Sequence, residues 1–203
     1  MRWRIGAVVA AFGVVSVLVH THASDPVDLW AYRHLYPDQH WGLPQMAGDV
    51  LVNLLQPAVT GVAFVLLAWR RSRSAVPGAL LRVAVVSVLV AFLKWFFDRP
   101  DVHGSTAHLG GSYPSGHMVS IVAYGGPWWL AALLALALLV TGTHWLTDVV
   151  AGVLTGWLIR QAFRRLHGER RGDAGRHGGA PHEAAALSST SATARRSPRS
   201  RRG

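Results

Sequence analysis

Two short stretches of this sequence carry the residue types that acid–base and phosphate chemistry need. The first runs Gly111-Ser112-Tyr113-Pro114-Ser115-Gly116-His117, and the second runs from His144 to Asp148. Both stretches lie between long apolar runs. Because polar and ionisable groups are costly near a bilayer, we treat both stretches as functional candidates.

The Pro-Ser-Gly-His sequence at 114–117 is predicted to open an apolar helix. A helix N-terminus presents unpaired backbone N–H groups and the positive end of the helix dipole, which together suit a phosphate. Ser115 adds a hydroxyl, Gly116 lets the backbone approach closely, and His117 could donate a proton to a leaving oxygen. A capped helix start with a histidine at the membrane interface is the structural alternative for this stretch alone.

His144 and Asp148 are four residues apart, so they share one face of a predicted helix. A carboxylate that accepts from one ring nitrogen fixes the tautomer and leaves the other nitrogen as a nucleophile. The structural alternative is a helix cap with a buried polar pair. The presence of the Ser-Gly-His stretch on the same membrane side favours chemistry.

Lys94 is the only lysine in the chain, against 19 arginines. It lies near the end of an apolar segment, where a lysine normally extends its amine to the interface. Because the chain uses arginine at its other cationic positions, we predict a specific role for Lys94, such as holding a phosphate oxygen.

The composition indicates a membrane protein. Of the 203 residues 51% are hydrophobic, and they occur in blocks. The formal charge of +10 comes from arginines at the ends of these blocks and in the C-terminal tail, which is typical of a bilayer partner and argues against nucleic acid. The absence of cysteine excludes disulfides and thiolate chemistry.

Six apolar segments are predicted to be membrane helices, at residues 5–19, 46–69, 75–97, 118–124, 128–140 and 145–163. The first is interpreted as an anchor, with a cleaved signal peptide as the alternative. Residues 24–45 are polar and aromatic, which is typical of the membrane interface, and Pro37 and Pro44 are predicted to break this stretch. Residues 98–113 form a Gly- and His-rich loop.

The chain is predicted to divide into a membrane-embedded domain, 1–165, and a basic tail, 166–203. The tail is rich in Gly, Ala, Ser, Arg and Pro, cannot bury apolar surface, and is predicted to be disordered beside anionic lipid. The arginines at 2, 4, 70–73 and 164 onward place these regions in the cytoplasm. The 98–113 loop and His144 are then extracytoplasmic.

This orientation requires an even number of crossings between His117 and His144, which a helical hairpin would supply. Only 26 residues separate the two histidines. Two helices of about 12 residues reach roughly 18 Å each, well short of a ~30 Å hydrocarbon core. The hairpin is therefore expected to be short and partly re-entrant, or the bundle to be defective here.

Together these residues resemble the type 2 phosphatidic acid phosphatase superfamily, which includes membrane lipid phosphate phosphatases. The family has three motifs: Lys-x6-Arg-Pro, Pro-Ser-Gly-His and Ser-Arg-x5-His-x3-Asp. The second is complete at 114–117, and the His-x3-Asp half of the third is complete at His144 and Asp148. The resemblance covers about residues 75–163 and implies an all-α integral membrane helical bundle of about six segments, with the phosphatase and haloperoxidase fold.

The resemblance also implies roles for the site residues. His144 would attack phosphorus and form a phosphohistidine, Asp148 would orient His144, and His117 would protonate the departing group. The phosphoryl oxygens would be held by Lys94, Ser115 and the Gly116 backbone. The family needs no metal and no other cofactor.

Two arginines of the family pattern are absent. The arginine of the first motif should fall seven residues after Lys94, where Asp101 stands, and the arginine of the third should fall at Leu138. Arg99 lies two positions early and is predicted to bind phosphate instead, because Pro100 ends the helix and frees its direction. Each lost charge-assisted bond would be worth roughly 1.5–3 kcal/mol in transition-state binding.

The function that these residues favour is hydrolysis of a phosphomonoester or diphosphate on a membrane lipid at the outer face. One alternative is a family member with little or no phosphatase activity that binds lipid phosphate or acts as a scaffold, and another is a structural membrane protein. A metal site at Asp101, His103 and His108 is disfavoured because the spacing fits no firm pattern. We make no prediction of the particular lipid or of the oligomeric state.

Overall fold

The computed structural model describes residues 2–36, 42–104 and 111–177. Within these ranges the secondary structure is helical, without strands. The chain divides into two units, Met1–Phe163 and Arg164–Gly203. The first unit contains the candidate site and is described here by itself.

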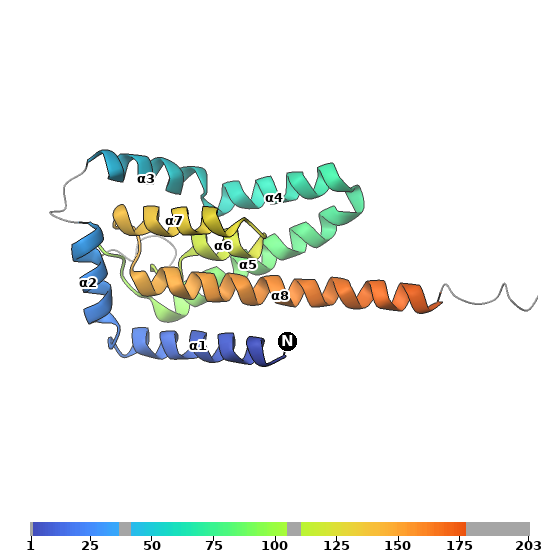
Figure 1. The fold of residues 1–203 in the computed structure, drawn as a ribbon, viewed down its shortest axis with the longest axis horizontal. Coiled ribbons are helices and arrows are strands. Elements are labelled where there is room, and N and C mark those ends of the chain that lie inside the picture. Colours follow the sequence, from blue (N-terminus) through green and yellow to red (C-terminus); the bar gives the residue numbers. More distant parts are fainter. Residues whose placement is uncertain (1, 37–41, 105–110, 178–203) are drawn as a thin grey trace, which may run out of the picture. The chain divides into compact units, whose positions relative to one another are not determined.

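The helices follow the apolar segments of the sequence (Figure 1). They are α1 (Arg2–His20), α2 (Asp25–Leu35), α3 (Leu43–Leu54), α4 (Pro57–Arg71), the 3₁₀ turn η2 (Arg73–Ala75), α5 (Val76–Phe97), α6 (Gly116–Ala123), α7 (Trp128–Val140) and α8 (Leu146–His177). Each of the six predicted segments is helical, so the all-α bundle is confirmed.

Two helical stretches, Trp3–His20 and Arg73–Phe97, are long and apolar enough to cross a bilayer. The pair α3 and α4 would supply a third span if it is counted as one. Large apolar side chains on the outer faces are exposed, among them Leu67, Val88 and Trp95. A surface of this kind suits lipid rather than water, which agrees with a membrane helical bundle.

The predicted single helix at 46–69 is wrong in one respect. The segment forms two helices, α3 and α4, which are bent by 49° at a break between Leu54 and Pro57. Proline lacks the N–H that would continue the helix, and its ring clashes with the preceding turn. Pro44 also differs from expectation: it lies in the first turn of α3, where a missing N–H costs nothing.

The short hairpin between the two histidines is as compact as its sequence predicts. Helix α6 has 8 residues and α7 has 13, which corresponds to roughly 12 Å and 20 Å of rise. A turn with Gly125 at positive φ joins them. Leu134 and Leu138 of α7 are fully buried in the main hydrophobic cluster.

Two glycines let α8 lie directly against α6. A Cβ atom at Gly152 would lie 2.8 Å from the Ser115 carbonyl oxygen, and one at Gly156 would lie 2.7 Å from the Val119 oxygen. Small residues spaced four apart allow close backbone approach between membrane helices. This contact fixes the start of α6, with Ser115, beside the first turns of α8.

Helix α8 extends further than predicted. It continues to His177, so the prediction of a non-helical tail from residue 166 is wrong up to that point. Extending an existing helix adds one hydrogen bond per residue without a new nucleation cost, which offsets the polar composition of this stretch. The remainder of the predicted tail, 178–203, lies outside the described residues.

The basic residues near the start of α1 and around the end of α4 lie at one end of the first unit, and the candidate site lies at the other (Figure 1). In Figure 1 the N-terminal end of α1 and the turn between α4 and α5 lie toward one end of this unit. The connection from α7 to α8, which carries His144, lies toward the opposite end. The basic residues at 2–4 and 70–73 are thus separated from the candidate site along the helix axes.

Candidate active site

His144 and Asp148 lie together at the start of α8. The His144 Nδ1 atom is 3.5 Å from Asp148 Oδ2, and the Asp148 side chain is completely buried. The ring thus presents one nitrogen to a carboxylate, which leaves Nε2 as the nitrogen available to a ligand. The imidazole borders a cavity, whereas the carboxylate does not.

Asp148 is held in place by the backbone on two sides. Its Oδ2 atom accepts a hydrogen bond from the Trp145 N–H at 3.0 Å, and its carbonyl accepts one from the Ser115 N–H at 3.0 Å. The first contact is a helix cap, so the capping role considered for Asp148 is present together with the His144 contact. The second contact joins the Pro-Ser-Gly-His stretch to the His144 stretch.

His117 faces the same cavity from the first turn of α6. The ring centroids of His117 and His144 are 6.0 Å apart, with the rings nearly perpendicular. The cavity has a volume of about 520 Å³, and both histidines line it. The two imidazoles that the sequence assigns to attack and to proton donation therefore meet at one site.

Lys94 and Gly116 also line this cavity. The Lys94 amine donates a hydrogen bond to the Gly111 carbonyl, across from the start of α6. Gly111 has a φ of +102°, and a Cβ atom there would clash with the Arg99 backbone, so the loop requires glycine at this position. The Gly111 carbonyl thereby holds the amine of Lys94, a residue of α5, at the cavity that His117 also lines.

Ser115, which is predicted to hold a phosphoryl oxygen, lies at the start of α6. It is fully buried beside Gly152 of α8 and does not line the cavity. Its hydroxyl has no hydrogen-bond partner in the part of the chain that the structure describes, and the same holds for His117 Nε2 and His144 Nδ1 by ordinary hydrogen-bond geometry. Buried polar atoms are usually paired, and His117 lines the cavity, so a ligand there could complete the bonding of its Nε2 atom.

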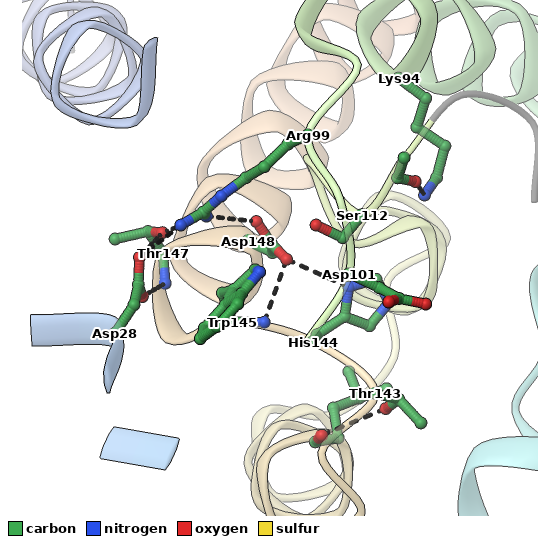
Figure 2. Close-up of polar contacts among 12 residues, drawn as sticks. Asp28, Lys94, Arg99, Asp101, Ser112, Thr143, His144, Trp145, Thr147 and Asp148 are labelled. Atoms are coloured by element: carbon green, nitrogen blue, oxygen red, sulfur yellow. Dashed lines mark hydrogen bonds and ion pairs between the residues drawn. The ribbon is translucent and has the colours of Figure 1, made fainter. Parts of the chain in front are cut away.

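Arg99 is not brought to the cavity. Its guanidinium binds Asp148 Oδ1 at 2.8 Å and Asp28 Oδ2 at 2.7 Å, on the far side of Asp148 from His144 (Figure 2). Its side chain is 10% exposed, and it lines a separate cavity of about 260 Å³. This placement does not support the prediction that Arg99 binds phosphate.

The two positions that depart from the family pattern lie in opposite environments. Asp101 lines the same cavity as His144. Leu138 is fully buried in the hydrophobic core of α7. Of the described residues that line the cavity, Lys94 alone carries a permanent positive charge, and Asp101 opposes it.

Two residues of this region were not found from the sequence. Asp28 lies on α2 and is 1% exposed. The sequence does not single it out, because residues 24–45 are polar and aromatic and are predicted as a whole to lie at the membrane interface. Thr147 lies between it and Asp148 and bonds both Arg99 and Asp28. Neither residue lies in a motif, and Asp28 is far from Asp148 in sequence, so no sequence signal points to this contact.

The site as described contains no evident metal centre: among the residues searched there is no group of three or more His, Cys, Asp or Glu side chains that could hold an ion. His103 lies outside the cavity and His108 lies outside the described residues. The ionisable groups that line the cavity include the two imidazoles, the Lys94 amine and the Asp101 carboxylate.

Comparison with known proteins identifies the fold. No protein-family profile and no curated protein sequence matches the chain. The fold is similar to that in the "Crystal structure of the first transmembrane PAP2 type phosphatidylglycerolphosphate phosphatase from Bacillus subtilis", with a TM-score of 0.63 and 17% identity over 82% of this chain and 97% of that chain. The chain therefore has the fold of a PAP2-type, that is type 2 phosphatidic acid phosphatase, transmembrane protein.

Proposed function

We propose that this protein is a membrane lipid phosphatase that hydrolyses a phosphomonoester or diphosphate at the outer face. The observation that carries the proposal is the meeting of His117 and His144 at one cavity, with Asp148 behind His144. The similarity to a lipid phosphatase fold supports the same reaction class. His117 Nε2 is buried at the cavity without a hydrogen-bond partner among the described residues, so a bound phosphate ester could complete its bonding.

The reaction proceeds in two steps. His144 Nε2 attacks phosphorus, the bond from phosphorus to the lipid oxygen breaks, and protonated His117 gives its proton to that oxygen. Water then attacks the phosphohistidine, passes a proton to His117, and releases phosphate as the P–N bond breaks. Lys94 and the free N–H groups at the start of α6 stabilise the charge on the phosphoryl oxygens.

The shape of the cavity supports a lipid substrate. One wall is formed by α5, which contributes Lys94. Val90 and Val86 line the same wall about one and two helical turns before Lys94. Val86 and Lys94 are thus about 12 Å apart along the helix. A cavity with a cationic end and an apolar end fits a molecule with a phosphate and a hydrocarbon chain.

A second candidate is a lipid-phosphate binding or scaffold protein with little turnover. It is favoured by the engagement of Arg99 with two acids and by the presence of Asp101 in the cavity. Both reduce the positive charge available to a phosphoryl group in the transition state. The sidedness of the site follows from the arginine distribution and is part of the same proposal.

The test is phosphate release by purified protein from phosphatidate, phosphatidylglycerol phosphate and a polyprenyl diphosphate, with EDTA present. Release from at least one lipid, lost in His144→Ala, is expected. Lipid binding without release from any of the panel would replace the phosphatase proposal with the binding candidate. Cysteines introduced at Ser105 and Ser189 should label from opposite sides of the membrane, and labelling from one side would overturn the outer-face placement.

A further inference from the structure

A second buried carboxylate lies behind the site, on the amphipathic helix α2. Asp28 accepts hydrogen bonds from the Thr147 N–H at 2.9 Å, from the Thr147 hydroxyl at 2.7 Å and from Arg99 at 2.7 Å. Its side chain is 1% exposed. Because a buried charge is costly without partners, this set of contacts must be formed whenever the bundle is folded.

Arg99 has little capacity left for a substrate. One terminal nitrogen donates to Thr147 Oγ1 at 2.7 Å and to Asp148 Oδ1 at 2.8 Å, and the other donates to Asp28. Burial alone would lower the pKa of Arg99, but the charges of Asp148 and Asp28 outweigh it and raise the pKa. The guanidinium also lies over the Trp145 ring, with its central carbon 5.4 Å from the ring centroid.

The two oxygens of Asp148 are thereby divided between two tasks. Oδ1 faces Arg99, and Oδ2 faces the Trp145 N–H and His144 Nδ1 (Figure 2). A carboxylate that is fixed at both oxygens cannot rotate away from the imidazole. The fork of Arg99 is in turn oriented by Asp28, since a planar guanidinium bound at both ends has one available geometry.

We propose that Asp28 and Arg99 are positioning residues for this site, which act through Asp148 to hold His144 in the tautomer and orientation that attack requires. The proposal rests on the function proposed above. Asp28 lies 120 residues from Asp148 in sequence. Helix α2, which is predicted to lie at the membrane interface, therefore supplies a residue that helps to orient His144. Residues that orient a ligating or reacting imidazole in this indirect way typically affect activity by about 10- to 100-fold.

Kinetics separate positioning from phosphate binding. The variants are Asp28→Asn and Arg99→Lys, which keep side-chain volume, and each is compared with the wild type in detergent on the best lipid of the panel. The turnover number is expected to fall about 10- to 100-fold. The Michaelis constant and the inhibition constant of inorganic phosphate are expected to stay within about twofold.

Asp25→Asn is the matched control. Asp25 is on the same helix, lies 3.9 Å from Arg99 and is 45% exposed, so it should contribute little through solvent screening. Its turnover is expected to stay within about twofold of the wild type. A rise in the Michaelis and phosphate constants of Arg99→Lys at unchanged turnover would show that Arg99 binds phosphate and would overturn the proposal.

A second measurement does not require turnover. In protein labelled with ¹⁵N-histidine, the His144 signals are assigned by comparison with His144→Gln, and the nitrogen shifts report which ring atom carries the proton. The wild type is expected to hold the Nδ1–H tautomer, and Asp28→Asn and Arg99→Lys are expected to mix the two tautomers. A fixed tautomer in both variants would overturn positioning, even if the wild type released no phosphate and the proposed reaction itself had failed.

Discussion

The two sides of Asp148 differ in how completely their polar groups are paired. On the Arg99 side, Asp28, Thr147 and Arg99 satisfy one another at 2.7–2.9 Å. On the His144 side, His117 Nε2 and His144 Nδ1 have no ordinary hydrogen bond among the described residues, and a cavity of about 520 Å³ lies beside them. We propose that the paired side sets the geometry of the site and that a ligand binds on the unpaired side.

The position of Arg99 follows from the pairing on its side of Asp148. A cation near Asp148 is needed on the paired side, because the carboxylate is wholly buried. Arg99 supplies it from the loop after α5, two positions earlier than the family pattern. The cavity side then retains Lys94 as its permanent cation among the described lining residues.

The largest expected effect is that of His144→Ala. Loss of the nucleophile should reduce turnover at least ~10³-fold, because only binding and charge stabilisation remain. Folding should be unchanged, since the residue precedes the helix and its ring borders a cavity. Phosphate release and trapping of an acid-labile phosphoenzyme, mapped by mass spectrometry, measure this.

His34→Ala is the control for that substitution. His34 lies on α2, is exposed, and contacts the Trp30 carbonyl at 2.7 Å, so its loss should leave turnover unaltered. Full lipid phosphate turnover by the His144→Ala protein would remove the cavity side from the reaction and leave the binding candidate.

Arg99→Met is expected to have the largest effect on stability. It would leave Asp28 and Asp148 buried without their cation, which typically costs about 3–5 kcal/mol. Unfolding of the detergent-solubilised protein, followed by helicity against denaturant, measures the loss. Arg33→Met on the exposed face of α2 should change stability by less than about 0.5 kcal/mol.

Lys94→Met tests the difference between the two sides of Asp148, because it removes the lysine that lines the cavity on the His144 side. It should destabilise the protein less than Arg99→Met, since Lys94 donates to one carbonyl and is not paired within a buried acid cluster. It should weaken inhibition by inorganic phosphate, which Arg99→Lys should not. If Lys94→Met were the more destabilising of the two, the assignment of geometry to one side and binding to the other would be wrong.

The fold was largely predictable, and the errors have local causes. Apolar periodicity and length predicted α1, α5 and the α6–α7 turn correctly. The break at Leu55–Gln56 was missed because Pro57 lies within an otherwise continuous apolar run. The end of α8 was missed because a polar composition indicates only that a segment is not buried. It does not show that an existing helix can be extended into such a segment at low cost.

The site was predictable only where its residues are close in sequence. The spacing of four between His144 and Asp148 predicts their contact, and the Pro-Ser-Gly-His stretch predicts a helix start. The pairing of Asp28 with Arg99 depends on how α2 folds back, for which neither residue type nor spacing gives a signal. The assignment of Ser115 to phosphate stays a prediction, because its buried hydroxyl has no partner among the described residues.

Ser115→Ala should have effects of opposite sign on stability and activity. An unpaired buried hydroxyl typically costs about 1–3 kcal/mol, so its removal should leave the unliganded protein equally or more stable. If a bound phosphate or water completes its bonding, turnover should fall by about tenfold, for one lost hydrogen bond of roughly 1.4 kcal/mol. Ser87→Ala, on the cavity wall of α5, is the matched control. Lower stability together with unchanged turnover would show that the hydroxyl serves packing alone.

Asp101→Asn is expected to have the smallest effect, in the direction of a gain. The carboxylate lines the cavity that also contains Lys94, so its charge opposes a phosphoryl group and offsets the amine. At an effective dielectric constant of about 20, one charge about 5 Å away is worth roughly 3 kcal/mol. Solvent in the open cavity reduces this to about 1 kcal/mol or less. Affinity for inorganic phosphate should therefore rise about two- to fivefold, with a smaller rise at high salt because the interaction is screened.

The same substitution tests whether the cavity side is built for phosphate alone. Asp98→Asn, at the end of α5 and outside the cavity, should leave phosphate affinity unchanged. If Asp101→Asn lowered the turnover of a lipid with hydroxyl groups near its phosphate while inorganic phosphate bound more tightly, the carboxylate would be accepting from the substrate. If phosphate affinity fell instead, Asp101 would be ordering Lys94 or the loop around it, and part of the geometry would lie on the side that we assign to binding.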